Sequence, residues 1–486
     1  MPKSFVKVLK QLASESVLYG MGNMVPRLLN FLLFPMHTQV FRPEEYGVFT
    51  YLMSAVAILN IVYSFGMETA YFRFATKPGA DQQRVFNQAF TTVFFISATL
   101  STLFIVASPQ FASWAGASEH PQYIVWLSLI LLVDNIVAIP FARLRLEKKP
   151  VRFAYYRITN VLILTGLNIY FLFFAYDPSI GIEYVFWANL IANSFYLLFF
   201  FPTLVRWRPI FDRTMLASMV PYAYPIMFTG IAGMMNEFFS RLALERWLPD
   251  NFYPGKDGRY AVGVFGAAYK FSVVMNLAVQ AFRMAGEPFF FSHAHQQKSP
   301  ELFARVNHYF VIVCCFILLA VGINMDVLKY IFLRKEEYWE AIAIVPPLLL
   351  GYLFLGVYYN LTVWFKITDR TYYGTAITVG GAVLTVVLNW LLIPRFGYMG
   401  SSWATAIVYG IMMAACYLLG RKHYPIPYHV GVDLSYIAGT FILVYLVNSF
   451  GFANQWHALG AHFAVLAFYV LVVLMLERKR WREAVG

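Results

Sequence analysis

The chain has 486 residues, of which 60% are hydrophobic and 13% are charged, and its formal net charge is +12 at pH 7. Soluble domains carry charge at about a quarter of their positions, so this composition excludes a soluble globular protein and indicates a chain that lies in a lipid bilayer. The hydrophobic runs are longer and less alternating than outer-membrane strands of about ten residues, which favours an α-helical bundle.

A helix needs about 20 mainly apolar residues to cross a bilayer. By that measure the sequence predicts an all-α, polytopic membrane protein with about fourteen spanning helices, and it leaves no soluble domain of useful size. In chain order the predicted spans are 12–34, 46–68, 86–108, 122–142, 154–176, 181–203, 215–241, 260–284, 306–325, 341–365, 372–393, 399–419, 432–450 and 456–476.

An internal repeat organises these spans. The segment 47–49 (Gly-Val-Phe) recurs 216 residues later at 263–265, and at the same offset Asn60 meets Asn276. Further matches at this offset pair Pro178, Gly181, Trp187, Ala188 and Ile191 with Pro394, Gly397, Trp403, Ala404 and Ile407. At an offset of 221, Arg145 meets Lys366 and Leu167-Asn168 meets Leu388-Asn389. We therefore predict a six-helix lobe over 1–213, a second over 214–423, and an added helix pair with a basic tail over 424–486.

The distribution of Lys and Arg among the loops predicts the orientation. If the amino terminus is cytoplasmic, the loops on that side hold most of the basic residues, while the loops 109–121, 177–183 and 451–462 on the other side hold none. Cytoplasmic loops are the ones enriched in Lys and Arg, so we expect both termini in the cytoplasm. The net charge of +12 then follows from topology and requires no nucleic-acid partner.

Polar residues inside the first predicted span form one stripe. Tyr19, Asn23, Arg27 and Asn30 follow helical spacing, with Pro26 beside them. A cation in hydrocarbon costs several kcal/mol unless it faces a partner or a wet cavity, so Arg27 is the clearest functional candidate. The alternative is a hydrogen-bonded seam between helices.

The eighth span repeats this pattern. Asn276, Gln280 and Arg283 are spaced at i, i+4 and i+7, and Lys270 lies earlier and closer to the middle of the membrane. A cavity-lining role is the prediction for Lys270. Arg283 lies near the cytoplasmic end, where extension to lipid headgroups is the alternative to a cavity role. Asn60 and Asn276, matched by the repeat, fit structural hydrogen-bonding pairs equally well.

Acidic residues in the spans have two interpretations. On the seventh span Glu237 and Arg241 are four residues apart and fit a local ion pair or an outer gate. Asp134, in the fourth span, and Glu68, near the inner end of the second, are candidates to bind a coupling proton or sodium ion. A structural role is the alternative for each of them.

Motifs of catalysis and ATP binding do not occur in the sequence. There is no Walker loop, no His-Glu-x-x-His and no paired-Cys zinc motif. We therefore expect no catalytic residues, no metal and no cofactor, and a transport process driven by a proton or sodium gradient, the membrane potential or a partner.

Three segments resemble those of a known family. These are 27–35 (RLLNFLLFP) with 43–49 (PEEYGVF), 140–149 (PFARLRLEKK) and 221–225 (PYAYP). Together with the six-plus-six repeat, they make the chain similar to the polysaccharide transporters, including O-antigen and lipid-linked oligosaccharide flippases, of the multidrug/oligosaccharidyl-lipid/polysaccharide exporter superfamily. The resemblance implies two six-helix lobes around a cavity that opens alternately to each side. It also implies that the final helix pair resembles the added pair that forms a lipid-facing groove in several relatives.

The resemblance implies transport of an undecaprenyl-pyrophosphate-linked oligosaccharide across the bacterial inner membrane, from the cytoplasmic to the periplasmic leaflet. A pyrophosphate needs cations in place of its hydration shell, so the expected substrate-binding residues are Arg27, Lys270, Arg283 and Arg241, with Asn23, Asn30, Asn276 and Gln280 beside them. Expected protein partners are a polysaccharide polymerase and glycosyltransferases. The alternatives are a lipid II flippase, a cation-coupled multidrug antiporter of the same superfamily, and a membrane glycosyltransferase or polymerase, for which the chain lacks large periplasmic loops or clustered acidic residues.

Overall fold

The structure is a computed structural model, which describes the backbone of residues 3–293, 299–450 and 455–485. The regular elements in these ranges are helices, which confirms the all-α prediction. The chain divides into two compact units, Met1–Glu245 and Arg246–Gly486. The first unit contains the helices α1 (Lys3–Val40), α2 (Pro43–Ser64), α3 (Met67–Ala75), α4 (Gln82–Val106), α5 (Ser108–Trp114), α6 (Pro121–Leu146), α7 (Pro150–Phe173), α8 (Glu183–Phe199), α9 (Phe201–Val205) and most of α10 (Arg213–Trp247).

The second unit begins with a long helix and ends with the added pair. Its helices are α11 (Gly258–His293), α12 (Ser299–Gly322), α13 (Met325–Phe332), the 3-10 helix η1 (Glu336–Ile344), α14 (Val345–Leu361), α15 (Val363–Ile367), α16 (Tyr372–His423), α17 (Val430–Ser449) and α18 (Gln455–Val485). Helix α10 clusters with the first unit, whereas the repeat places it at the start of the second lobe, so the division at 213 and 214 stays a prediction.

Helix starts follow from local sequence. Pro43 occupies the first turn of α2, where its missing N–H breaks no hydrogen bond, and the Glu45 carboxylate accepts a hydrogen bond of 3.0 Å from the Arg42 N–H. Asp81 caps α4 by accepting from the N–H groups of Gln83 and Arg84 at 3.0 and 3.1 Å. These caps set helix boundaries at the loop ends of the spans.

Eleven helical segments of the described chain are long and apolar enough to cross a membrane, so the protein is a multi-pass membrane protein. Two of the predicted spans fall within the single 52-residue helix α16, which is interrupted at Gly397 (φ 55°, ψ −136°). Helix α8 has only 17 residues. The number fourteen therefore stays a prediction, although each predicted span overlaps helical residues.

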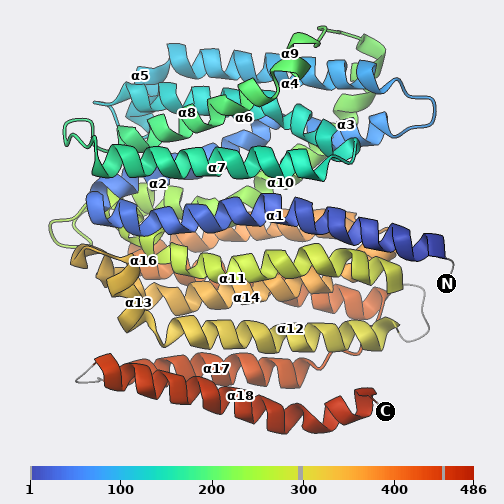
Figure 1. Ribbon diagram of the computed structural model, residues 1–486. Helices are drawn as coiled ribbons and strands as arrows, with labels where there is room; N and C mark the ends of the chain where they lie inside the picture. The colour runs from blue at the N-terminus through green and yellow to red at the C-terminus, as the bar shows by residue number, and fades with distance from the viewer. Residues whose placement is uncertain (1–2, 294–298, 451–454, 486) are drawn as a thin grey trace. The chain divides into compact units, whose positions relative to one another are not determined.

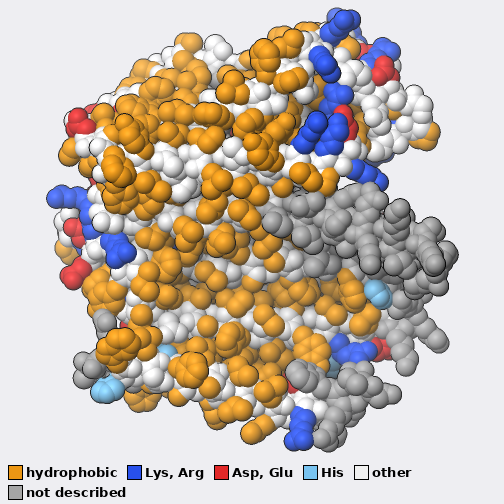
Figure 2. Space-filling model, viewed as in Figure 1, with side chains coloured by type: hydrophobic (Ala, Val, Ile, Leu, Met, Phe, Trp, Pro, Cys, Tyr) orange, Lys and Arg blue, Asp and Glu red, His pale blue; other side chains and the backbone are white. Residues whose placement is uncertain are grey.

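Apolar side chains cover the helices outwards as well as inwards. Phe174, Trp390 and Met475 are 79%, 61% and 73% exposed, as expected where the solvent is lipid. Figure 2 shows hydrophobic side chains over the length of the helices, with charged side chains near helix ends. Figure 1 shows α1 running beside α7 in the first unit and α17 beside α12 in the second.

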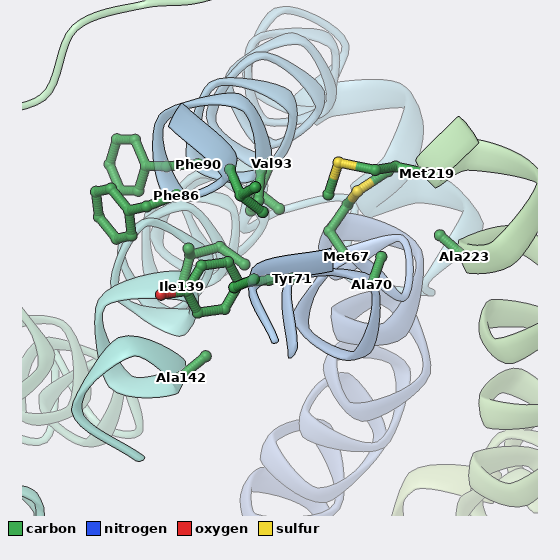
Figure 3. Close-up of a cluster of buried hydrophobic side chains, with 13 residues drawn as sticks. Met67, Ala70, Tyr71, Phe86, Phe90, Val93, Ile139, Ala142, Met219 and Ala223 are labelled. Carbon is green, nitrogen blue, oxygen red and sulfur yellow. The ribbon is translucent and has the colours of Figure 1, made fainter. Parts of the chain in front are cut away.

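A buried cluster joins four helices of the first unit (Figure 3). Between α2 and α3 the backbone of Gly66 has φ 68°, and a β-carbon there would lie 2.5 Å from the Ala223 carbonyl oxygen of α10. Only glycine allows α10 to approach this closely. The labelled cluster residues are Met67, Ala70 and Tyr71 of α3, Phe86, Phe90 and Val93 of α4, Ile139 and Ala142 of α6, and Met219 and Ala223 of α10.

Two asparagines matched by the predicted repeat share one of their hydrogen bonds. The Nδ2 groups of Asn168 and Asn389 each donate a hydrogen bond of 2.8 Å to the carbonyl four residues earlier. The Asn168 Oδ1 lies 2.9 Å from His37 Nε2, and the Asn389 Oδ1 accepts from Ser401 at 3.0 Å. Both asparagines are buried, and the shared hydrogen bond to the fourth residue before agrees with the predicted repeat, although the Oδ1 partner of Asn168 lies on another helix and that of Asn389 lies in α16 itself.

Candidate functional site

The first helix places its candidate side chains outwards. Arg27 and Asn30 of α1 are exposed, and Leu28 and Leu32 beside them are each 52% exposed. The side chain of Asn23 lies outside the described part of the structure. If α1 spans the membrane as predicted, an exposed guanidinium among exposed leucines requires water or an anionic partner, and Arg27 stays a predicted contact for substrate.

Helix α10 buries the second candidate cation. Arg241 is only 4% exposed, and its guanidinium lies 4.9 Å from the centroid of the Phe238 ring. Glu237, one turn earlier, is half-buried. Because Arg241 is buried and packs on Phe238, a structural role within α10 is as consistent with its position as the binding of an anion.

Asp134 lies in a polar chain that links three helices of the first unit. Its Oδ1 accepts a hydrogen bond of 2.8 Å from Asn193 of α8, and Asn193 in turn accepts one of 3.1 Å from Asn160 of α7. The neighbouring Asn135 donates to Asn60 at 2.7 Å, so this asparagine of the repeat joins α2 to α6. The contacts give Asp134 a structural partner, and ion coupling at this residue stays a prediction.

Glu68 pairs with Arg145, and this pair has a counterpart in the second unit. Glu68 forms a salt bridge from α3 to Arg145 of α6. In the second unit the Glu287 carboxylate lies 2.5 Å from the Lys366 Nζ of α15. Arg145 and Lys366 are the residues that the repeat matched, so each unit has one acid–base pair at equivalent helix ends. This pairing favours a structural role for Glu68.

The candidates on α11 divide into two groups. Arg283 lies 3.6 Å from Glu287 and its guanidinium is 4.8 Å from the centroid of the Tyr359 ring, so this cation is partly neutralised. Gln280 donates a hydrogen bond of 3.3 Å to Asn276, and both are half-buried, as is Lys270. The structure brings Asn276 and Gln280 together and places both Arg283 and Lys366 beside Glu287, and the substrate-binding role of these residues stays a prediction.

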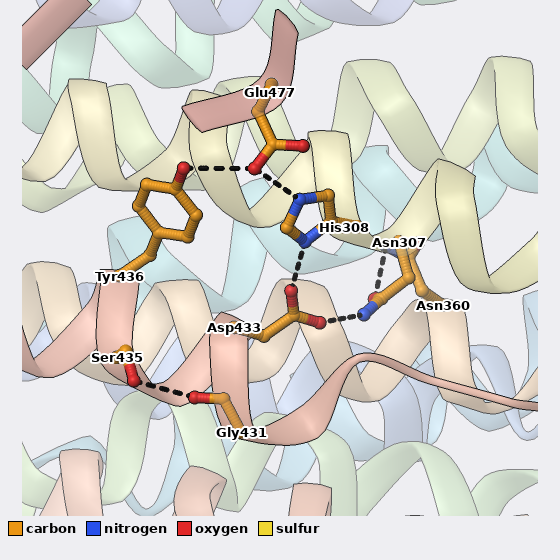
Figure 4. A network of polar contacts seen from close by, with 8 residues as sticks. All are labelled: Asn307, His308, Asn360, Gly431, Asp433, Ser435, Tyr436 and Glu477. Carbon is orange, nitrogen blue, oxygen red and sulfur yellow. Dashed lines mark hydrogen bonds and ion pairs between the residues drawn. The ribbon is translucent and has the colours of Figure 1, made fainter. Parts of the chain in front are cut away.

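A buried network in the second unit was not identified from the sequence. The Nδ1 of His308 on α12 contacts the Asp433 carboxylate of α17, and its Nε2 lies 3.2 Å from the Glu477 Oε1 of α18 (Figure 4). Tyr436 donates to Glu477 at 3.0 Å, and Asn307 donates to Asp433 at 3.4 Å. His308, Asp433 and Glu477 lie far apart in the chain. The one feature of the sequence that could have indicated this network is that a histidine and acidic residues lie at the ends of predicted spans. The network fastens both added helices to α12.

The added helix pair encloses an apolar hollow of about 380 Å³. Gly439 and Leu443 of α17 face Phe468 and Val472 of α18 across it, and Glu477 lies at one end. Its lining suits an aliphatic chain, as the resemblance implies for this pair.

Comparison with known proteins shows what this chain is similar to. Residues 38–244 match a family described as polysaccharide biosynthesis protein. Lsg locus putative protein 1 of Haemophilus influenzae is 23% identical over 407 residues, which cover 81% of this chain and 96% of that protein.

Two solved structures share the fold. The lipid II flippase MurJ in an inward closed conformation has a TM-score of 0.72 at 13% identity, covering 95% of this chain and 99% of that one. A multidrug resistance MATE family transporter of the MOP superfamily, facing inward, has a TM-score of 0.63 at 14% identity and covers 84% and 97%. The family match over residues 38–244 supports the predicted resemblance of this chain to the polysaccharide transporters, and the two solved structures show that it shares the fold of a lipid II flippase and of a MATE family transporter.

Proposed function

We propose that the protein is a flippase that moves undecaprenyl-pyrophosphate-linked oligosaccharide precursors of a surface polysaccharide from the cytoplasmic to the periplasmic leaflet. It works by alternating access in the bacterial inner membrane, with both termini in the cytoplasm. It is a transporter and not an enzyme. Glycosyltransferases supply its substrate and a polysaccharide polymerase receives the product.

The observation that carries this proposal is the match of residues 38–244 to polysaccharide biosynthesis proteins, on a fold that a lipid II flippase shares. The chemistry agrees with it. A pyrophosphate must leave water to cross the bilayer, and guanidinium and ammonium groups replace its hydration. Arg27 and Lys270 are the cations that we assign to substrate, because Arg27 is exposed on the first predicted span and Lys270 is half-buried within α11. We assign two further cations to substrate binding: Arg241, which is buried, and Arg283, which forms a salt bridge with Glu287.

Two alternatives have a structure in their favour. A lipid II flippase is favoured by the TM-score of 0.72 to MurJ, and a cation-coupled multidrug antiporter by the MATE fold. The antiporter requires acidic groups in its cavity, whereas most of the intramembrane candidates here are basic or amide side chains. The energy source in our proposal is a proton or sodium gradient or the membrane potential, because the sequence contains no Walker motif.

Reconstitution of the purified protein in liposomes tests the proposal. Fluorescent lipid-linked oligosaccharide is placed in both leaflets, and an impermeant glycosidase reports how fast the protected pool becomes accessible. Parallel arms use lipid II and a fluorescent cationic drug. We expect movement of the lipid-linked oligosaccharide that exceeds movement of lipid II. Movement of the drug alone would establish the multidrug antiporter. Movement of lipid II alone would establish the lipid II flippase.

A further inference from the structure

A second hollow of about 510 Å³ lies in the first unit, where α6 ends and α7 begins. Its wall also includes the start of α4 and the segment around α9. The loops at this end of the helices carry the basic residues that assign it to the cytoplasmic side. Figure 2 shows Lys and Arg side chains gathered at the end of this unit where α9 lies.

The charges in this hollow are strongly unbalanced. Five cationic side chains line it, and Glu147 is its only acidic lining residue among the described side chains. The cations are Arg143, Lys149, Arg152, Arg206 and Arg208.

Glu147 neutralises part of this charge. Its carboxylate lies 2.6 Å from the Arg143 Nε and 2.5 Å from the Lys149 Nζ. Partial burial raises the pKa of Glu147, but the hydrogen bonds from Lys149 and Arg143 outweigh it and lower that pKa, so the carboxylate is ionised at neutral pH. Within the described part of the chain, no hydrogen bond or ion pair engages the guanidinium groups of Arg152, Arg206 or Arg208, and all three side chains are exposed. Three guanidiniums therefore remain available to a ligand.

The placement of Lys149 and Arg152 is unfavourable for the helix itself. Lys149 is the residue before α7 and Arg152 lies in its first turn, which contains no acidic residue. The amino-terminal end of a helix carries partial positive charge and its first N–H groups have no partner within the helix, so cations here repel it and an anion stabilises it. A bound anion offsets this repulsion. The general excess of Lys and Arg in cytoplasmic loops does not by itself explain why several cations line one hollow at a helix start.

One wall of the hollow is aromatic. The Tyr156 ring stacks on Phe199, with centroids 4.8 Å apart and planes at 14°, and meets Phe200 edge-on at 5.2 Å. Tyr156 lies one helical turn after Arg152 on α7, so the hollow pairs an anion-binding rim with an aromatic surface for an apolar or sugar group. Its volume accommodates a diphosphate with part of an attached group.

We propose that this hollow binds the diphosphate group of a polyprenyl-diphosphate-linked sugar at the cytoplasmic leaflet, before the substrate enters the transport path. The proposal rests on the proposed function, because that function supplies the substrate. Arg152, Arg206 and Arg208 bind the phosphoryl oxygens, and Glu147 limits the affinity by holding Arg143 and Lys149.

Binding measurements on the full chain in phosphatidylcholine nanodiscs test this site. Tryptophan fluorescence is followed during titration with undecaprenyl diphosphate, inorganic pyrophosphate and phosphatidylglycerol in separate arms. The test variant is R152Q/R206Q/R208Q. The matched control is R370Q/R421Q/K422Q, which removes the same number of cations from same-side loops of the second unit.

We expect the test variant to bind undecaprenyl diphosphate and pyrophosphate about tenfold more weakly than wild type, because charge-assisted hydrogen bonds are lost, and the control to bind as wild type. Glu147→Gln is expected to tighten binding several-fold, a result that a merely structural role for these residues does not give. Equal weakening by test and control variants would overturn the site. Equally tight binding of phosphatidylglycerol would show a general lipid-headgroup site and overturn the substrate assignment.

Transport measurements separate the site from the function. If the test variant retains the wild-type dependence of flipping rate on substrate concentration, the site is wrong and the flippase function stands. If no lipid-linked sugar moves in any assay, the proposed function fails, and tight pyrophosphate binding by wild type shows an anion site that serves another purpose.

Discussion

Gly181 and Gly397 lie 216 residues apart and share a positive φ of 55°. Each lies three residues after a matched proline, Pro178 or Pro394; Gly181 lies in the turn before α8, and Gly397 interrupts helix α16. A β-carbon at Gly397 would lie 2.1 Å from the Tyr253 hydroxyl, whereas the nearest atom to one at Gly181 is the Pro178 carbonyl oxygen at 3.6 Å. The two matched glycines therefore share a left-handed φ but differ in how closely other atoms pack against them.

Substitution of each glycine by alanine should separate the cost of backbone strain from the cost of a steric clash. Gly181→Ala introduces backbone strain alone and is expected to cost about 1 kcal/mol, and Gly397→Ala adds a clash and is expected to cost about 3 kcal/mol. Thermal unfolding of the purified variants in one detergent measures the difference. Equal melting temperatures for the two variants would contradict this interpretation.

The network around His308 should fasten α17 and α18 to α12. His308→Leu leaves two buried carboxylates without their shared partner, which we expect to cost about 3 kcal/mol. Limited proteolysis should then release the segment after residue 430 while the rest of the second unit stays protected. Glu301→Gln, in the exposed first turn of the same helix, is the control and should behave as wild type. Unchanged protease resistance in His308→Leu would show that apolar packing alone holds the helix pair.

The two equivalent salt bridges should contribute little but similar amounts. The side chains of Glu68, Arg145, Glu287 and Lys366 are 29% to 42% exposed, so solvent screens both pairs. Double-mutant cycles with glutamine are expected to give a coupling of about 0.5 kcal/mol in each unit, weaker at high salt. A cycle between Glu287 and Arg421 is the control and should give none. Coupling in only one unit would mean that the pairs are not equivalent.

Asp212 should make stability depend on acid pH. Its carboxylate accepts hydrogen bonds of 3.0 Å from the Met215 and Thr214 N–H groups and pairs with Arg84 at 2.7 Å. The Met215 hydrogen bond, with the Arg84 charge, lowers the pKa of Asp212. An acid whose folded pKa lies below its unfolded value stabilises the fold above the unfolded value, about 3.9, and loses that contribution as pH falls through the folded pKa.

The matched variant is Asp212→Asn, since asparagine also caps helices but carries no charge. We expect its melting temperature to lie below that of wild type at pH 6 and to approach it below about pH 4. Asp250→Asn, at an exposed position, should follow wild type throughout. A constant difference between Asp212→Asn and wild type across this range would refute the charge effect.

Neutralising Arg27 or Lys270 should reduce transport without reducing protein abundance. Arg27→Gln and Lys270→Gln each remove a cation from a spanning helix, and we expect the rate of lipid-linked oligosaccharide flipping to fall at least about tenfold. Arg421→Gln, at the loop end of α16, is the control. Quantitative immunoblotting verifies abundance. Normal flipping by both variants would remove these residues from the substrate path.

Much of the architecture was predictable because it depends on local periodicity and length. Long apolar runs require helices, since only a helix satisfies its own backbone hydrogen bonds in lipid. The repeat was predicted from a few residues, and the shared φ of Gly181 and Gly397 and the shared i−4 hydrogen bond of Asn168 and Asn389 agree with it. Arg145 and Lys366 were matched by sequence, but their acidic partners were not.

The partners of polar side chains were decided by tertiary structure alone. Sequence singled out Arg283 as a cation for substrate, and packing placed it beside Glu287. Sequence passed over His308, whose carboxylate partners lie 125 and 169 residues further along the chain. The basic loop after α6 was visible as charge, but its convergence with Arg206 and Arg208 on one hollow was not. Helix formation is local and can be predicted from spacing, whereas the desolvation and pairing of a charge depend on which helix lies beside it, and that is set by the packing of the whole unit.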